Sequence, residues 1–271
     1  MDGLYLYCIR KTTSMNHEPS VKGIDGKGVV YKHSAGKLEA VVSSVSLDEF
    51  SKEAIEKRAR DDLDWIKSKA MDHENIMEKM MQINDKKIAI IPMRFGIIIK
   101  DKAELNEILN NNYNKFNKIL DRIRNKQEWS IKLYMKNSKY IKTAIEKNSE
   151  IIINKRMEMS LLSEGMAYFM EEELNNTIIN EYNKELDEIK RLVLDRLKKI
   201  SVESVLNKNL EKKLTGRNEE MILNAALLIH DANINIFEKL INTINLDLQK
   251  KGINIEYSGP WPCYNYVGDQ N

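Results

Sequence analysis

The sequence predicts an α+β protein built of two domains. Its 271 residues are more than one average domain needs, and a hydrophobic content of 42% is enough to form cores. Short apolar or alternating runs bounded by turn residues, typical of strands, are interspersed with longer segments whose apolar residues recur every three or four positions, typical of helices. We expect an N-terminal mixed α+β domain over residues 1–126 and a C-terminal domain over residues 127–271.

The N-terminal domain is predicted to begin with an apolar, aromatic strand, Leu4–Ile9, followed by a polar loop through Pro19. Glycines at 23, 26 and 28 follow. Because they lead into a strand and lack the spacing of phosphate-binding loops, we interpret them as a turn. A β-hairpin is predicted next, with strands at 29–31 and 38–42 joined by a turn at 34–37.

A helical region is predicted from Ser46 to about Gln82. Ser46-Leu47-Asp48-Glu49 has the form of a capping box, in which the serine and glutamate side chains bind backbone amides of the first turn. His73-Glu74 lies in this region, but Met77 occupies the position where a zinc-protease motif needs its second histidine. We therefore expect His73 on a polar helix face.

Arg94 is the most informative charge in the chain. It lies in Pro92-Met93-Arg94-Phe95-Gly96, between apolar runs that predict a buried strand, an interruption and a second strand. An arginine among buried strands needs carboxylate or carbonyl partners, because an unpaired buried charge is very costly. The favoured interpretation is an internal ion pair that fixes the bend, and recognition of a partner's carboxylate is the alternative. Asp101 then caps a helix over 102–126.

The C-terminal domain is predicted to be ferredoxin-like, with β-α-β-β-α-β order. An alternating strand, Trp129–Met135, precedes a long helical region over 137–199. The part of that region around 137–163 is expected to be an inserted or protruding helical segment. Two strands, an amphipathic helix and a last strand follow at 201–206, 221–229, 233–250 and 253–257.

Charge and composition exclude several classes of function. The 43 Lys+Arg and 41 Asp+Glu are interleaved, which disfavours a nucleic-acid partner. No apolar run is long enough to span a membrane, and we expect no secretory signal at the first residues. Cys8 and Cys263 lack metal-ligand spacing, so two buried free thiols are expected. Since no nucleophile–base set, metal cluster or nucleotide loop is recognisable, we expect a binding protein without cofactors and not an enzyme.

The segment Ser258–Val267 is rich in proline and aromatic residues. Pro260 and Pro262 exclude a helix and a central strand position. We expect the chain to turn at Ser258-Gly259 and then to lie extended on the second domain as an ordered strap, held by its three aromatic side chains, Trp261, Tyr264 and Tyr266. An exposed aromatic tail that docks a partner is the alternative.

Several segments together resemble the gas vesicle accessory proteins of the GvpF/GvpL family. The tail Gly259-Pro260-Trp261-Pro262, with Tyr264 and Val267, is similar to the family's C-terminal signature, although Cys263 stands where the family usually has a second proline. Other similar segments follow in family order and span nearly the whole chain: Tyr5–Ile9, Ile91–Gly96, Glu128-Trp129-x-x-Lys132, Gly165–Phe169 and Asn224–Leu228.

The resemblance implies a non-enzymatic accessory protein of gas vesicle formation, located in the cytoplasm and at the gas vesicle. It implies contacts with the major shell protein, a small hydrophobic subunit, and with other accessory proteins. We expect exposed apolar surface or an unpaired sheet edge to make these contacts. A small-molecule-binding or enzymatic module with a pocket near Arg94 is the alternative. Candidate structural or partner-contact residues are Arg94, Phe95, Trp261, Tyr264 and Tyr266.

Overall fold

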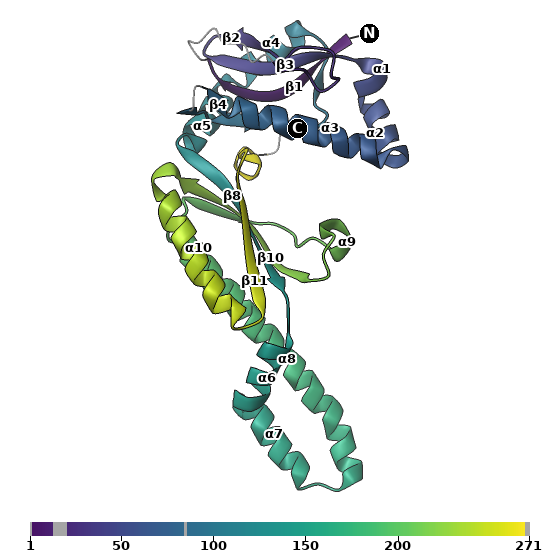
Figure 1. The fold of residues 1–271 in the computed structure, drawn as a ribbon, viewed down its shortest axis with the longest axis vertical. Coiled ribbons are helices and arrows are strands. Elements are labelled where there is room, and N and C mark those ends of the chain that lie inside the picture. The colour runs from purple at the N-terminus through teal and green to yellow at the C-terminus, as the bar shows by residue number, and fades with distance from the viewer. Residues whose placement is uncertain (1, 13–20, 84–85, 269–271) are drawn as a thin grey trace. The chain divides into compact units, whose positions relative to one another are not determined.

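The computed structural model describes residues 2–12, 21–83 and 86–268, and it divides into two compact units (Figure 1). Within the described residues, the first unit runs to Glu128 and includes the C-terminal segment from Pro260, and the second unit is Trp129–Gly259. Each unit combines helices with a sheet, which confirms the mixed α+β class. Most of the polar loop predicted through Pro19 lies outside the described residues.

The first unit is organised on a sheet with strand order β2-β3-β1-β6, in which β7 also pairs with β1. The central strand β1 (Asp2–Lys11) pairs antiparallel with β3 (Leu38–Ser46). It also pairs antiparallel with β6 (Ile90–Pro92) and β7 (Ile98–Ile99). The predicted hairpin is confirmed, since β2 (Tyr31–Ala35) pairs antiparallel with β3.

The helical region predicted from Ser46 to about Gln82 is three helices: α1 (Leu47–Phe50), α2 (Lys52–Asp61) and α3 (Leu63–Met80). The breaks have a local cause, because the Ser51 and Asp62 side chains each accept a hydrogen bond from an amide three residues ahead and so begin a new helix. Ser46 caps α1 as predicted, although its hydroxyl accepts from the amide two residues ahead.

The helix predicted over 102–126 is also divided. Asp101 caps its start as predicted, with Oδ1 accepting from the amides two and three residues ahead at 2.9 Å each. The helix then breaks at Asn112 into α4 (Lys102–Asn111) and α5 (Tyr113–Ile123). A short strand pair, β4 (Gln82–Ile83) and β5 (Lys86–Lys87), lies earlier in the chain, between α3 and β6.

The second unit is built on a four-stranded sheet with order β11-β8-β10-β9. Two amphipathic helices, α8 (Glu164–Lys198) and α10 (Ile234–Gln249), pack their apolar residues on it and form one hydrophobic core. The four strands are β8 (Lys126–Met135), β9 (Glu203–Leu206), β10 (Glu220–His230) and β11 (Ile253–Trp261).

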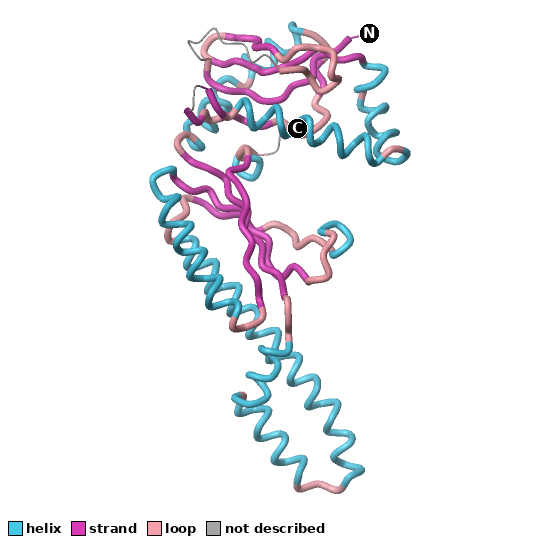
Figure 2. The backbone as a smooth tube through the Cα atoms, in the orientation of Figure 1, coloured by secondary structure: helices cyan, strands magenta, loops and turns pink. Residues whose placement is uncertain are grey.

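The long helical region predicted over 137–199 consists of α6 (Lys139–Asn148), α7 (Glu150–Ser160) and α8. Figure 2 shows α6 and α7 beside α8, to which α7 is linked by the ion pair between Lys155 and Glu173. A short helix α9 (Lys212–Thr215) lies between β9 and β10. Among the described helices, none combines the length and the apolar character that crossing a membrane requires.

Candidate functional site

The C-terminal segment packs on the first unit. β11 continues through Gly259 to Trp261, so the turn predicted at Ser258-Gly259 is wrong, and a short 3₁₀ helix η2 (Tyr264–Tyr266) follows. The sequence predicts that this tail belongs to the second domain, whereas its described residues from Pro260 on cluster with the first unit. Four residues of the segment are buried, and only one of them is aromatic: Pro262, Cys263, Tyr266 and Val267. Cys263 is a free buried thiol, as is Cys8.

Tyr264 joins a buried hydrogen-bond network centred on His73. The Tyr264 hydroxyl donates to Glu74 Oε1 at 2.9 Å and lies 3.3 Å from His73 Nε2. His73 Nε2 is 3.1 Å from the Met93 carbonyl oxygen, and Nδ1 is 2.9 Å from the Tyr5 hydroxyl. Because a carbonyl only accepts, Nε2 carries the proton and Nδ1 accepts from Tyr5.

The prediction that His73 lies on a polar helix face is wrong, because its side chain is only 1% exposed. Burial lowers the pKa of His73 to about 4, and its hydrogen bond to the Met93 carbonyl opposes this shift. Burial also raises the pKa of the Glu74 carboxyl, and the hydrogen bond from Tyr264 opposes that shift. A neutral histidine with both nitrogens hydrogen-bonded is suited to hold the tail in place.

A second polar anchor lies at Glu128, whose carboxylate binds the tail twice. The Asn265 amide nitrogen donates to Glu128 Oε2 at 3.0 Å, and Asn265 Nδ2 donates to Oε1 at 2.6 Å. Nearby, Arg122 Nη1 donates to the Tyr266 carbonyl at 3.4 Å. The Tyr266 side chain is 1% exposed. Tyr264 and Tyr266 therefore anchor the tail to the first unit.

Phe95 also contacts this cluster. Its ring lies edge-on to the rings of Tyr5 and His73, with centroid distances of 6.3 and 6.2 Å. Phe95 and Tyr264 thus meet at the same histidine. Trp261, by contrast, is 36% exposed, so its predicted burial against the body is only partial.

Arg94 is exposed, so its predicted burial within a strand region is wrong. The reason is that it occupies the interruption between β6 and β7, where the chain leaves the sheet. The buried arginine of the first unit is Arg10, which sequence reasoning missed. Its Nε lies 2.6 Å from Glu39 Oε1, and the two side chains are 2% and 1% exposed. Arg10 and Glu39 face each other in the register of β1 and β3.

The first unit also contains an apolar cavity of about 330 Å³. Met93 and Ile97, on either side of Arg94, line it, and ten of its twelve lining residues are apolar. Asn112 and Lys115 are its polar members. Such a lining offers few groups for orienting a polar substrate.

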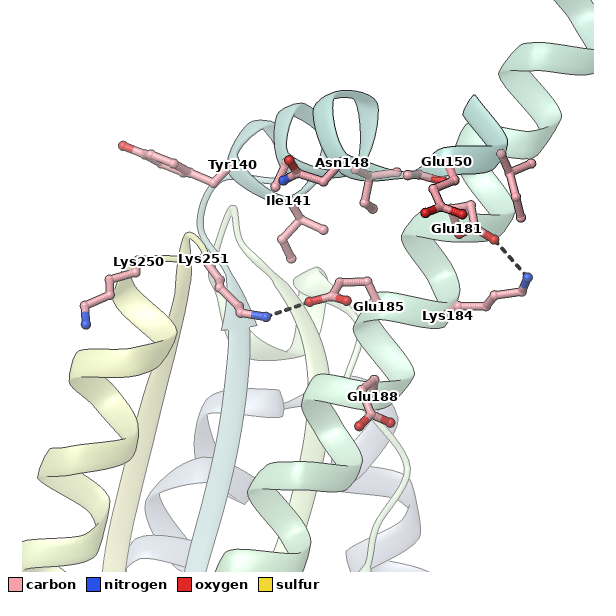
Figure 3. Close-up of a pocket in the computed structure, with 14 residues that line it drawn as sticks. Tyr140, Ile141, Asn148, Glu150, Glu181, Lys184, Glu185, Glu188, Lys250 and Lys251 are labelled. Atoms are coloured by element: carbon pink, nitrogen blue, oxygen red, sulfur yellow. Dashed lines mark hydrogen bonds and ion pairs between the residues drawn. The ribbon is translucent and has the colours of Figure 1, made fainter. Parts of the chain in front are cut away.

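A larger groove of about 830 Å³ lies in the second unit, between α6, α8 and the residues after α10 (Figure 3). Two ion pairs neutralise four of its charged side chains: Lys251 Nζ lies 2.6 Å from Glu185 Oε1, and Lys184 Nζ lies 2.8 Å from Glu181 Oε1. These pairs are partly or largely exposed, so we interpret the groove as a solvated surface. In the part of the chain that the structure describes, no group of three His, Cys, Asp or Glu side chains is arranged to hold a metal ion.

Comparison with known proteins adds to this description. A family model described as "Gas vesicle synthesis protein GvpL/GvpF" matches residues 3–268. Gas vesicle protein L from Streptomyces sp. (strain CB03234) is 21% identical over 265 residues, which cover 97% of this chain and 92% of that protein. The crystal structure of GvpF from Anabaena sp. PCC7120 has a TM-score of 0.76 at 19% identity and matches 100% of both chains. GvpF from Microcystis aeruginosa has a TM-score of 0.67 at 19% identity, covering 98% of this chain and 99% of that chain.

Proposed function

Because the chain belongs to the GvpL/GvpF family of gas vesicle synthesis proteins, we propose that it is a non-enzymatic accessory protein that binds assembly partners. Its partners are the major shell protein, a small hydrophobic subunit, and other accessory proteins of gas vesicle formation. The match of the family model over residues 3–268 carries the proposal, since it includes residues of both units. The protein acts in the cytoplasm and at the gas vesicle.

The edge of the second sheet supports a mode of binding. β9 is the outermost strand in the order β11-β8-β10-β9, and it pairs antiparallel with β10. Leu206 on β9 is 61% exposed, and Val202, just before the strand, is 50% exposed. An outer strand with exposed apolar side chains accepts an extended or hydrophobic partner segment.

The backbone of β9 supports the same mode. The Asn207 amide donates to the Asn224 carbonyl of β10 at 2.8 Å. Hydrogen-bonding direction alternates along an antiparallel strand, so the amides of Ser204 and Leu206 point away from β10. Main-chain hydrogen bonds to these amides would supply affinity, and contacts with Leu206 would add selectivity for an apolar partner.

A pull-down with the full-length chain tests the proposal. The shell protein and each of the other accessory proteins are offered separately. Leu206→Lys places a charge on the edge and should reduce recovery of its partner about tenfold with unchanged melting temperature, a loss of about 1.4 kcal/mol. Leu246→Lys on α10 is the matched control, because Leu246 is 62% exposed. If both variants recover equal amounts of the partner, β9 is not the binding edge. If the wild-type chain recovers none of the offered proteins, the proposed partners are wrong.

We further propose that the second unit is a modified ferredoxin-like domain with a helical insertion formed by α6 and α7. The strand order β11-β8-β10-β9 and the chain order of strands and long helices support this assignment. Limited proteolysis tests the division into two domains: cleavage at the exposed turn Arg124-Asn125, just before β8, should leave a protected second unit. Uniform degradation of residues 129–259 would contradict it.

Ligand binding near Arg94 is a second candidate function, because Met93, its neighbour in the chain, lines the apolar cavity. An apolar chain with an acidic end suits its lining, with Lys115 as the charged partner. Dodecanoate should then raise the melting temperature of the full-length chain, and Ile119→Trp, which fills the cavity, should abolish the rise. An absence of any rise would eliminate this function.

A further inference from the structure

The turn between α7 and α8 presents a second apolar surface, separate in the chain from β9. We call it the hairpin tip and define it by five exposed apolar residues of the segment 157–169. Their exposures range from 59% to 86%, which is unusual for aromatic and long aliphatic side chains: Met157, Leu161, Met166, Tyr168 and Phe169. The Tyr168 and Phe169 rings contact each other edge-to-face, with centroids 6.1 Å apart. Clusters of this kind on soluble proteins mark interaction sites.

Within residues 157–183, which include the hairpin tip, the charges have one sign. From Met157 to Asn183 the sequence contains glutamates at 158, 164, 171, 172, 173 and 181 and no lysine or arginine. Just before this stretch, Lys155 and Arg156 pair with Glu173 and Glu146. The glutamates at 158, 164, 171 and 172 lie exposed beside the apolar residues. The whole chain has a formal net charge of +2, so this negative charge is a local property of the tip.

The hairpin tip is also rich in methionine. Four of the 13 methionines of the chain lie between 157 and 170, and all four are exposed or half-exposed. Unbranched thioether side chains adapt their shape to a partner, which suits a surface that receives an apolar helix face.

We propose that the hairpin tip docks an amphipathic helix of a protein partner, one whose apolar face is bordered by lysine and arginine. The apolar face covers the five exposed residues, and the basic side chains meet the glutamates around them. Charge selects this occupant over the others. An anionic lipid surface is repelled by the glutamates, and two copies of the tip repel each other for the same reason. This surface goes beyond the edge binding proposed for β9.

A binding assay with the full-length chain tests this inference. The probe is a fluorescein-labelled leucine/lysine peptide of about 18 residues, or about five helical turns, with one apolar face. Substituting Leu161, Tyr168 and Phe169 together by serine should weaken its binding about tenfold or more. The control substitutes exposed leucines elsewhere in the same unit, Leu214→Ser with Leu246→Ser, and should bind as the wild type does.

The second part of the assay varies the charge of the hairpin tip and the sequence of the peptide. Glu164→Gln with Glu171→Gln and Glu172→Gln should weaken binding and reduce its dependence on salt. A scrambled peptide of the same composition should bind at least about tenfold more weakly than the amphipathic one. Equal affinity of the serine variant and the wild type, or of the two peptides, overturns the proposal. It is also overturned if the serine substitutions abolish self-association in sedimentation or binding to phosphatidylglycerol vesicles while leaving peptide binding intact. Because the β9 variant and the tip variants are assayed separately, failure of one proposal does not decide the other.

Discussion

Replacing Tyr266 by alanine should destabilise the first unit strongly, whereas replacing Trp261 should have a smaller effect. Tyr266 is 1% exposed and Trp261 is 36% exposed, although both are aromatic residues of the same tail. Truncating a fully buried aromatic side chain to alanine costs about 3–5 kcal/mol, because the cavity it leaves is only partly filled by relaxation. Trp261 keeps 36% of its surface in water in the folded state, so we expect a smaller loss, roughly 2 kcal/mol, for its removal.

The assay combines thermal unfolding with hydrogen exchange measured by mass spectrometry. A loss of about 3 kcal/mol corresponds to a fall in melting temperature of about 10 °C for a unit of this size. Exchange resolves where the loss occurs: peptides from β1, β3 and α3 should lose protection in Tyr266→Ala, because these elements belong to the unit on which the tail packs.

Two results would refute this reasoning. The first is a loss of protection in β8, β10 and α10 with the first unit unchanged, which would return the tail to the second unit. The second is an equal effect of Tyr266→Ala and Trp261→Ala, which would mean that burial in the structure does not rank the two side chains. Tyr266→Phe serves as the conservative control and should retain most of the stability, since it keeps the buried ring.

Three further predictions concern charges of the first unit. Arg10→Ala should lower the free energy of unfolding by about 3–5 kcal/mol, because the buried Glu39 carboxylate loses its ion pair with Arg10. Arg10→Met with Glu39→Leu should recover most of this loss in urea denaturation, and no recovery would contradict the ion-pair explanation. The pKa of His73 is lowered from 6.5 to about 4 on folding, so its contribution to stability is present above pH 6.5 and is lost as the pH falls towards 4, an amount of about 3 kcal/mol. His73→Phe should flatten this part of the plot of stability against pH. The measurement is made in a Glu74→Gln background, because the pKa of Glu74 is raised on folding and its protonation changes stability in the opposite direction. An unchanged slope would contradict the role given to His73. Arg94→Ala should leave the melting temperature unchanged because the side chain is exposed, and a loss of about 3 kcal/mol would restore the internal-anchor interpretation.

Local rules explain which parts of the fold the sequence predicted. Leu4–Ile9, the hairpin and the Asp101 cap depend on runs of apolar residues and on side chains that bind nearby amides, and all are found as expected. The breaks at Ser51, Asp62 and Asn112 were missed because apolar periodicity continues across them. Ser51 and Asp62 are residue types that cap helices, so the signal was present but weaker than the period around it.

Burial of polar groups could not be predicted in the same way. Arg10 and Glu39 stabilise each other because the register of β1 and β3 places them opposite one another, and register depends on the whole hairpin and its turn. His73 has the sequence context of a surface histidine, and only the approach of Tyr5, Met93 and Tyr264 from distant segments buries it. Arg94 was misjudged for the opposite reason, because the apolar runs around it belong to strands that end before and begin after it.

The composition of the tail predicts that it packs on the protein surface, but it does not predict which unit it packs on. Proline and aromatic residues indicate an extended segment that packs on a surface, but nothing in them distinguishes one unit from the other. The placement on the first unit has a consequence for folding. His73, Glu74 and Glu128 acquire their hydrogen bonds to Tyr264 and Asn265 only when the last residues of the chain are available. A buried acceptor left without its donor costs roughly 1–3 kcal/mol, so the first unit reaches its full stability only after the second has been synthesised.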